Sequence, residues 1–239
     1  IMICFKSVRG KNIMNRKIRR ERHAFDTLYN RFIKRILDML VAGTILLVIW
    51  PLYLIIGLMI IADDGFPIFY RGERGGYQGK TFHICKFRTM VKNADKIGGG
   101  TTALNDPRIT YIGNILRKTK LDELPQIGQV FTGKMSFVGP RPELIKYVEQ
   151  YEGEEKNILQ VRPGITDFSS VKFISLDEIV GNKNADEMYE RYVLEKKNKL
   201  RIKYAQEVSF KIDVYLFFKT ISSVLGKVYR MFLRNCNEK

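Results

Sequence analysis

A pair of adjacent carboxylates, Asp122 and Glu123, carries the strongest chemical signal in the sequence. Pro125 is tolerated in a helix only in the first turn, so we expect a helix to begin near Asp122. Cations and free backbone N–H groups at that position would lower the pKa of the carboxyl and keep it ionised. Such an anion can attack phosphorus or bind a metal, whereas a plain N-cap is the non-catalytic alternative. The cations within five residues of Asp122 are Arg117, Lys118 and Lys120.

Two turns present an arginine on a stiff backbone, which suits phosphate binding. Arg141 lies between two prolines in Gly139–Pro142, and Arg162 opens Arg162–Thr166. An arginine held this way can bind phosphate through two parallel hydrogen bonds, although each motif alone is more typical of a surface turn. A nucleophilic anion that meets an anionic diphosphate also needs neutralising charge, which Mg²⁺ with Arg or Lys supplies.

The composition points to an acidic partner. The 239 residues carry a formal net charge of +16, which favours nucleic acid, anionic lipid or a phosphorylated substrate. Three scattered cysteines give no disulfide framework and fit a reducing, cytoplasm-facing location. The chain begins with Ile1, Met14 is a candidate for the native start, and no cleavable signal peptide is recognisable.

Residues Met39–Ala62 form an uncharged apolar segment of 24 residues, long enough to cross a bilayer. A single crossing is the simplest interpretation. Pro51 near the midpoint disrupts a helix, and both flanks are basic, so a segment that enters the membrane, turns and returns keeps both flanks inside. On the residues alone these two topologies are about equally favoured, and a buried core helix is disfavoured because every face is apolar.

The expected fold is mixed α/β and helix-rich. We divide it into a basic lead-in over 1–31, a proline-broken re-entrant membrane helix over 32–64, a small α/β catalytic body over 65–206 and a basic amphipathic helix over 207–239. Alternation predicts a strand over 82–87, and an apolar face predicts a helix over 124–131. The amphipathic C-terminal helix suits either the core or a membrane interface of anionic lipid.

Several motifs in this order resemble the bacterial sugar transferases, also called monotopic phosphoglycosyl transferases. The resemblance runs from about Phe32 to Leu225, and the order of the whole set is what makes it specific. The motifs are Lys34–Asp38, Phe69–Arg71, Lys86–Met90, Asp106–Thr110, Leu121–Gln126, Met135–Pro142 and Val161–Thr166.

The resemblance implies a ping-pong transfer of a phosphosugar from a UDP-sugar to polyprenyl (undecaprenyl) phosphate. Asp122 would attack the β-phosphate, UMP would leave and an aspartyl-phosphosugar would remain, with Glu123 assisting. It further implies Mg²⁺ with Asp122 as a ligand, a membrane break at Trp50 and Pro51, and action at the cytoplasmic face of the bacterial inner membrane to start surface polysaccharide or glycoconjugate assembly. A homo-oligomer is compatible with it, and nucleic acid is not an expected partner. The expected phosphate and nucleotide ligands are Lys86, Arg88, Arg117, Arg141 and Arg162.

The sequence departs from the family pattern at three places. Trp50 stands where the family commonly has Ser, Lys134 stands where it usually has an acid, and Asp167–Val171 replaces a common Gly-Trp-Ala-Gln-Val. The last departure leaves the sugar open. The competing hypothesis is a non-catalytic, membrane-tethered protein that binds anionic lipid or nucleic acid, which the basic charge alone would permit.

Overall fold

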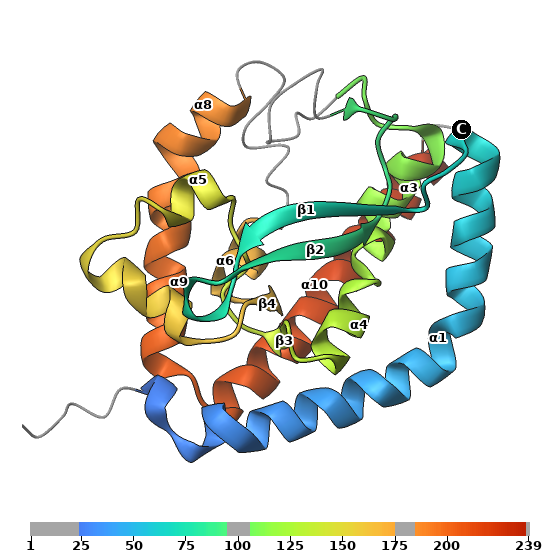
Figure 1. The fold of residues 1–239 in the computed structure, drawn as a ribbon. Coiled ribbons are helices and arrows are strands. Elements are labelled where there is room, and N and C mark those ends of the chain that lie inside the picture. Colours follow the sequence, from blue (N-terminus) through green and yellow to red (C-terminus); the bar gives the residue numbers. More distant parts are fainter. Residues whose placement is uncertain (1–23, 95–105, 175–184, 238–239) are drawn as a thin grey trace, which may run out of the picture.

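The protein folds into a helix-rich α/β body, which the computed structural model describes for residues 24–94, 106–174 and 185–237 (Figure 1). The strands are β1 (Phe69–Gly75), β2 (Thr81–Phe87), β3 (Ser136–Val138) and β4 (Gly164–Thr166). The α-helices are α1 (Lys34–Asp64), α3 (Tyr111–Thr119), α4 (Gln126–Phe131), α5 (Ile145–Val148), α6 (Phe168–Lys172), α8 (Ala185–Tyr189), α9 (Glu195–Glu207) and α10 (Phe210–Asn237). The short 3₁₀ and π turns are η1 (Ala24–Asp26), η2 (Tyr29–Ile33), η3 (Tyr77–Gly79), η4 (Leu121–Glu123), η5 (Gly153–Gln160) and η6 (Glu190–Leu194).

The apolar segment forms α1, which Figure 1 shows as a long helix with a sharp bend about midway. Pro51 lies inside this helix, where its missing N–H and its ring favour a bend. Within the described residues, the helical stretch Tyr29–Asp64 is the one long and apolar enough to cross a bilayer. One face of α1 packs on the body through Ala42, Ile56 and Ile60, and the remaining apolar faces are exposed.

The hairpin β1–β2 carries one wall of the site. The strands are antiparallel and pair from Phe69 opposite Phe87 to Gly75 opposite Thr81. Ile84 and Phe87 are buried on opposite faces of the strand, so β2 is anchored in two core clusters. The prediction of a strand over 82–87 is confirmed, and β2 begins one residue earlier.

The parallel pair β3–β4 joins the two arginine turns of the sequence. Ser136 pairs with Gly164, and Val138 pairs with Thr166. Gly139 and Gly164 meet so closely that a Cβ on Gly164 would lie 2.1 Å from the Gly139 nitrogen, so both positions need glycine. The turn that bears Arg141 therefore lies directly beside the turn that bears Arg162.

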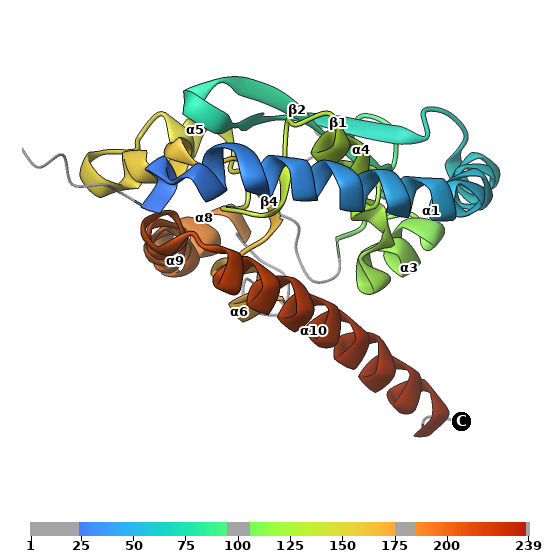
Figure 2. The ribbon, with the colours of Figure 1, turned by 90° about the horizontal axis from the view of Figure 1, so that it is seen from below.

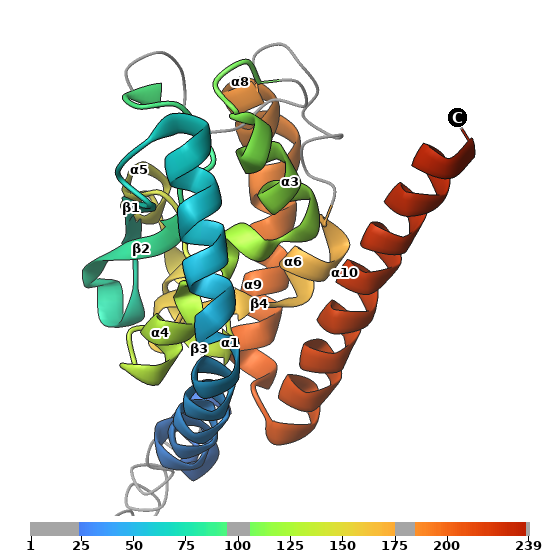
Figure 3. The same ribbon diagram turned by 90° about the vertical axis from the view of Figure 1, so that its right-hand side faces the viewer.

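The C-terminal helices close the other side of the body. Figure 2 shows the hairpin on one side of α1 and helices α9 and α10 on the other, and Figure 3 shows α10 leaving the body towards its C-terminal end. The first turns of α10 pack on the core through Leu216, which is buried with Val138, Tyr204 and Val208. On its exposed side, from its first residue onward, α10 carries an apolar stripe formed by Phe210, Val214, Phe218, Ile221 and Leu225.

Candidate active site

The turn that carries the two carboxylates is η4, which lies between α3 and α4. Lys120 enters it with a left-handed φ of 63°. Leu121 and Leu124, on either side of the pair, pack in the apolar cluster that includes α1 residues Ile56 and Ile60. The Tyr53 hydroxyl, also on α1, donates a hydrogen bond of 2.6 Å to the Leu124 carbonyl. The carboxylates are thus held directly against the apolar helix.

A 3₁₀ turn begins at Leu121, close to the expected helix start near Asp122, but the alternative in which Asp122 is a plain N-cap is wrong. Asp122 lies inside the 3₁₀ turn η4, and the α-helix begins only at Gln126, after Pro125, which occupies the N-cap position without a side-chain cap bond. The first-turn proline therefore displaces the α-helix start to a point beyond the carboxylates. The predicted helix over 124–131 is confirmed and is two residues shorter at its start.

Glu123 is the charge centre of the site. Arg141 donates to both of its carboxylate oxygens, with 3.0 Å between Nη1 and Oε2, and Lys86 Nζ lies 3.1 Å from Oε1. Burial by itself would raise the pKa of Glu123, but the charges of Arg141 and Lys86 outweigh burial and hold that pKa well below its usual range. Glu123 is therefore a fixed anion that orients two cations.

Asp122 has a different environment from its neighbour. Its Oδ2 lies 3.9 Å from Lys86 Nζ, and its buried Oδ1 has no hydrogen-bond partner in the described part of the chain. Burial raises the pKa of Asp122 and outweighs the Lys86 charge that lowers it, so the expected depressed pKa is wrong. The cause is burial to 6% exposure, which the sequence does not reveal. Asp122 is thus a partly compensated carboxylate with one oxygen left for a ligand.

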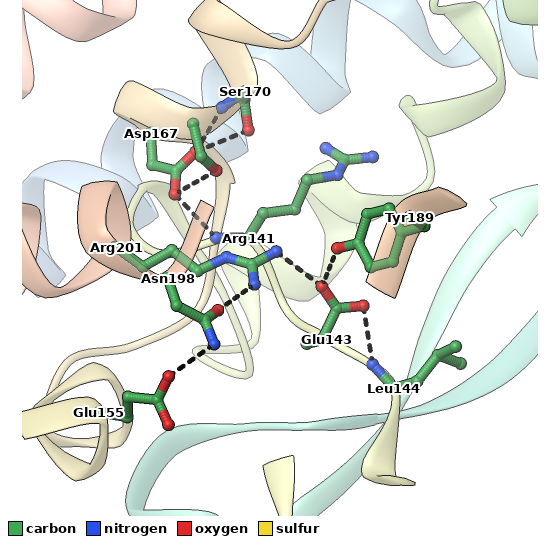
Figure 4. Close-up of polar contacts among 10 residues, drawn as sticks. Arg141, Glu143, Leu144, Glu155, Asp167, Ser170, Tyr189, Asn198 and Arg201 are labelled. Carbon is green, nitrogen blue, oxygen red and sulfur yellow. Dashed lines mark hydrogen bonds and ion pairs between the residues drawn. The ribbon is translucent and has the colours of Figure 1, made fainter. Parts of the chain in front are cut away.

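Arg141 is positioned by β4 and by the start of α6. Its Nη1 also donates to the Ile165 carbonyl at 3.0 Å, and its backbone N–H donates to Asp167 Oδ2 at 3.4 Å (Figure 4). Asp167 is fully buried, caps α6 through the Ser170 N–H at 2.7 Å and accepts from the Ser169 hydroxyl. In the sequence, Asp167 stands out only as a departure from a family pattern, and no local signal indicates this role.

A second buried network lies just beyond Arg141. Figure 4 shows Glu143 accepting from Tyr189 and from Arg201, while Asn198 bonds Arg201 in turn. Burial would raise the pKa of Glu143, but the charge of Arg201 holds it below its usual value. Burial lowers the pKa of the nearby Lys197 to about 7. These contacts hold Glu143, the residue directly after the Arg141 turn, in place. No local motif in the sequence indicated them.

The remaining predicted phosphate ligands have their hydrogen bonds and ring contacts elsewhere in the described residues, although burial raises the pKa of Asp122 and the charge of Arg117 partly offsets that rise. Arg88 is bonded to the Asp64 carboxylate and to the carbonyls of Asp64 and Gly65, so it closes the C-terminal end of α1. Arg117 Nη1 lies 3.5 Å from the Thr89 hydroxyl, and the Arg162 guanidinium lies over the Tyr77 ring at 5.1 Å. Of the five predicted cations, the structure brings Lys86 and Arg141 to the carboxylates.

The expected membrane break and the expected metal ligand stay predictions, and the structure shows the surroundings of both. Trp50 and Pro51 lie exposed on α1. Among the described residues no three His, Cys, Asp or Glu side chains are grouped so as to hold a metal. Mg²⁺ usually binds through one or two carboxylates together with substrate phosphates, so the unpartnered Oδ1 of Asp122 fits a ligand of that kind.

Comparison with known proteins places this geometry in context. A model of the family described as bacterial sugar transferase matches residues 29–227. The UDP-glucose:undecaprenyl-phosphate glucose-1-phosphate transferase of Escherichia coli K12 is 36% identical over 196 residues, which are 80% of this chain and 40% of that protein. The exopolysaccharide production protein ExoY of Sinorhizobium fredii is 34% identical over 206 residues, covering 80% of this chain and 84% of ExoY. The UDP-N-acetylgalactosamine-undecaprenyl-phosphate N-acetylgalactosaminephosphotransferase of Aeromonas hydrophila is 32% identical over 197 residues, or 81% and 44%.

Proposed function

The chain belongs to the bacterial sugar transferase family, and on this premise we propose that it transfers a phosphosugar from a UDP-sugar to polyprenyl phosphate with release of UMP. Relatives named for a UDP-glucose and for a UDP-N-acetylgalactosamine reaction, both with undecaprenyl phosphate, support the two substrate classes. Because those relatives differ in the sugar, the proposal leaves the sugar open. The product would start a surface polysaccharide or glycoconjugate.

One observation carries the proposal: a carboxylate with an unbonded oxygen lies beside two partly buried cations, on a turn packed against the apolar helix. Asp122 supplies the oxygen, and Lys86 and Arg141 supply the positive charge. Leu121 and Leu124 join this turn to α1. A water-soluble diphosphate and a lipid phosphate could meet here, because the charged cluster and the apolar surface are contiguous.

The reaction would proceed in two displacements at phosphorus. The Asp122 carboxylate forms a bond to the β-phosphorus, the bond to the bridging oxygen breaks, and UMP leaves with that oxygen and its electron pair. A polyprenyl phosphate oxygen then bonds to the same phosphorus, and the aspartyl oxygen leaves as carboxylate. The diphosphate linkage lost in the UDP-sugar is regained in polyprenyl-diphospho-sugar, so little energy needs to be supplied.

The charged residues would have different roles in this reaction. Arg141 and Lys86, aligned by Glu123, would stabilise the negative charge that develops on the phosphoryl oxygens. Asp122 and the substrate diphosphate would hold Mg²⁺, which would supply further charge neutralisation. Since Asp122 is largely covered in this conformation, substrate binding requires the turn around it to open.

We place α1 in the cytoplasmic face of the bacterial inner membrane as a re-entrant helix with both ends inside. The bend of α1 and the contacts of both of its halves with the body support this topology (Figure 1). Single cysteines at exposed Leu28 and Lys80, in a chain with its own cysteines replaced, should both react from the cytoplasmic side. Labelling from opposite sides would exclude the re-entrant topology. Pro51→Leu should shift the helix towards a true crossing.

Turnover is the direct test of the proposed reaction. The protein in detergent or nanodiscs should release many UMP per enzyme from at least one member of a UDP-sugar panel, and this repeated turnover should depend on polyprenyl phosphate and Mg²⁺. One lipid-linked phosphosugar should form for each UMP. Binding of lipid and nucleotide sugar without UMP release would instead favour the tethered binding protein.

A further inference from the structure

Gln126, the first residue of α4, has a side chain that the protein itself does not satisfy. It is 0% exposed, and neither its amide nitrogen nor its amide oxygen has a hydrogen-bond partner in the described part of the chain. Buried amides in native proteins are almost always bonded, so an orphaned one requires an explanation.

Gln129, three residues further along the same helix, shows what a structural glutamine looks like here. Its Oε1 accepts from the Cys85 N–H at 2.8 Å, and its Nε2 donates to the His83 carbonyl at 2.6 Å. Both groups join α4 to β2, and the side chain is completely paired. The same short helix thus has one glutamine used for packing and one left unpaired.

The position of Gln126 indicates what could pair with it. It follows Asp122 by four residues, at the start of the helix that comes after η4, and Asp122 Oδ1 is the other unpartnered buried side-chain oxygen of this segment. An amide needs an acceptor for its NH₂ and a donor for its oxygen at once. A phosphosugar presents both within a few bonds, since its phosphoryl oxygens accept and its hydroxyls donate.

We propose that Gln126 binds the phosphosugar that Asp122 takes up, with Nε2 donating to a phosphoryl oxygen and Oε1 accepting from a sugar hydroxyl. This inference rests on the proposed function and adds a substrate-binding residue to that site. The opening that exposes Asp122 to substrate would also expose the Gln126 amide. Loss of the amide would then weaken handling of the phosphosugar and leave the nucleotide unaffected.

The test compares Gln126→Met with Gln129→Met, two substitutions of similar size on one helix. Gln126→Met should lower kcat/KM for the UDP-sugar about 10- to 100-fold, the range for a lost hydrogen bond to a charged group. Its unfolding temperature should stay unchanged or rise, because no intramolecular bond is lost. The inhibition constant of UMP, which lacks the sugar, should also stay unchanged. Gln129→Met should do the reverse, with a lower unfolding temperature and kcat/KM within a few-fold of wild type.

A second variant, Gln126→Glu, keeps the test decisive if Gln126→Met fails to fold. Gln126→Glu keeps the shape of the side chain and replaces the donor by an anionic acceptor, so its loss of kcat/KM should equal or exceed that of Gln126→Met. Wild-type kcat/KM in either folded variant would overturn the inference while the proposed function stood. An equal loss of UMP binding would also overturn it, since that would indicate a general disturbance. A wild-type chain that releases no UMP would overturn both proposals.

Discussion

Two buried carboxylates, Asp122 and Asp213, each face a lysine, and they differ in how completely they are bonded. Asp213 on α10 accepts from the Tyr204 hydroxyl at 2.6 Å through Oδ1, and from the Tyr29 hydroxyl at 2.6 Å and Lys34 through Oδ2. Asp122 lies 3.9 Å from its lysine and keeps Oδ1 unbonded. The difference separates a carboxylate that holds the fold from one that is available to a substrate.

The Asp213 cluster has a clear structural task. Lys34 is the first residue of α1, and Tyr204 lies on α9, so the cluster ties three helices together where their ends meet (Figure 2). Every polar atom of the Asp213 carboxyl is used there, which offsets the cost of burying the charges. The Asp122 cluster leaves that cost uncompensated at one oxygen, as active sites commonly do.

The sharpest test of the comparison is Asp122→Asn. Because an amide is a poor nucleophile, UMP release should fall by about 10⁴-fold or more. The unfolding temperature should be unchanged or higher, since the variant removes a buried charge whose pKa is raised. The wild type incubated with UDP-sugar alone should release UMP in a burst of one per enzyme and gain the mass of a phosphosugar. A burst of the same size in the variant would contradict a covalent Asp122 intermediate.

Asp213→Asn should have the opposite profile. Breaking a buried, hydrogen-bonded ion pair is expected to reduce the free energy of unfolding by about 3 kcal/mol, because Lys34 is left without its counter-charge. Turnover per folded molecule should stay near wild type at a temperature below the transition. Denaturant unfolding measures the first quantity, and exposed Glu154→Gln serves as the matched control. An unchanged free energy of unfolding would show that a fully hydrogen-bonded carboxylate such as Asp213 does not stabilise the fold.

Glu123→Gln tests the orienting role of the second carboxylate. One neutral amide cannot hold both Arg141 and Lys86, so we expect kcat/KM to fall about 100-fold. The pH profile gives a separate signature. In the proposed reaction the ionised form of Asp122 is the active one, so activity should be lost as the pH falls through its pKa. That pKa is raised first by burial and further by Glu123. Removing Glu123 should therefore move the acid limb to lower pH, and an unmoved limb would contradict the assignment.

Whether the sequence predicts a contact of this site depends on how far apart the two interacting residues lie along the chain. The pair Asp122–Glu123, the strand that bears Lys86 and the turn that bears Arg141 are local signals, and all were found. The bond from Arg88 to the end of α1 and the pairing of Glu143 with Arg201, 58 residues away, depend on tertiary packing that no local pattern encodes. The raised pKa of Asp122 was missed for the same reason, because burial outweighs its charged sequence neighbours.

The contact between α1 and the catalytic turn gives the smallest expected effect. Tyr53→Phe removes the hydrogen bond to the Leu124 carbonyl and leaves the ring packed, which should cost about 1 kcal/mol in transition-state stabilisation, or a fall of roughly five-fold in kcat/KM. Stability should change by no more than that amount. The effect should be larger with polyprenyl phosphate limiting than with the UDP-sugar limiting, because α1 contributes the apolar side of the site. Tyr111→Phe, at an exposed position on α3, is the control. If Tyr53→Phe and Tyr111→Phe lowered kcat/KM equally, the hydrogen bond from Tyr53 would not set the geometry of the turn, and α1 would support the turn only by packing.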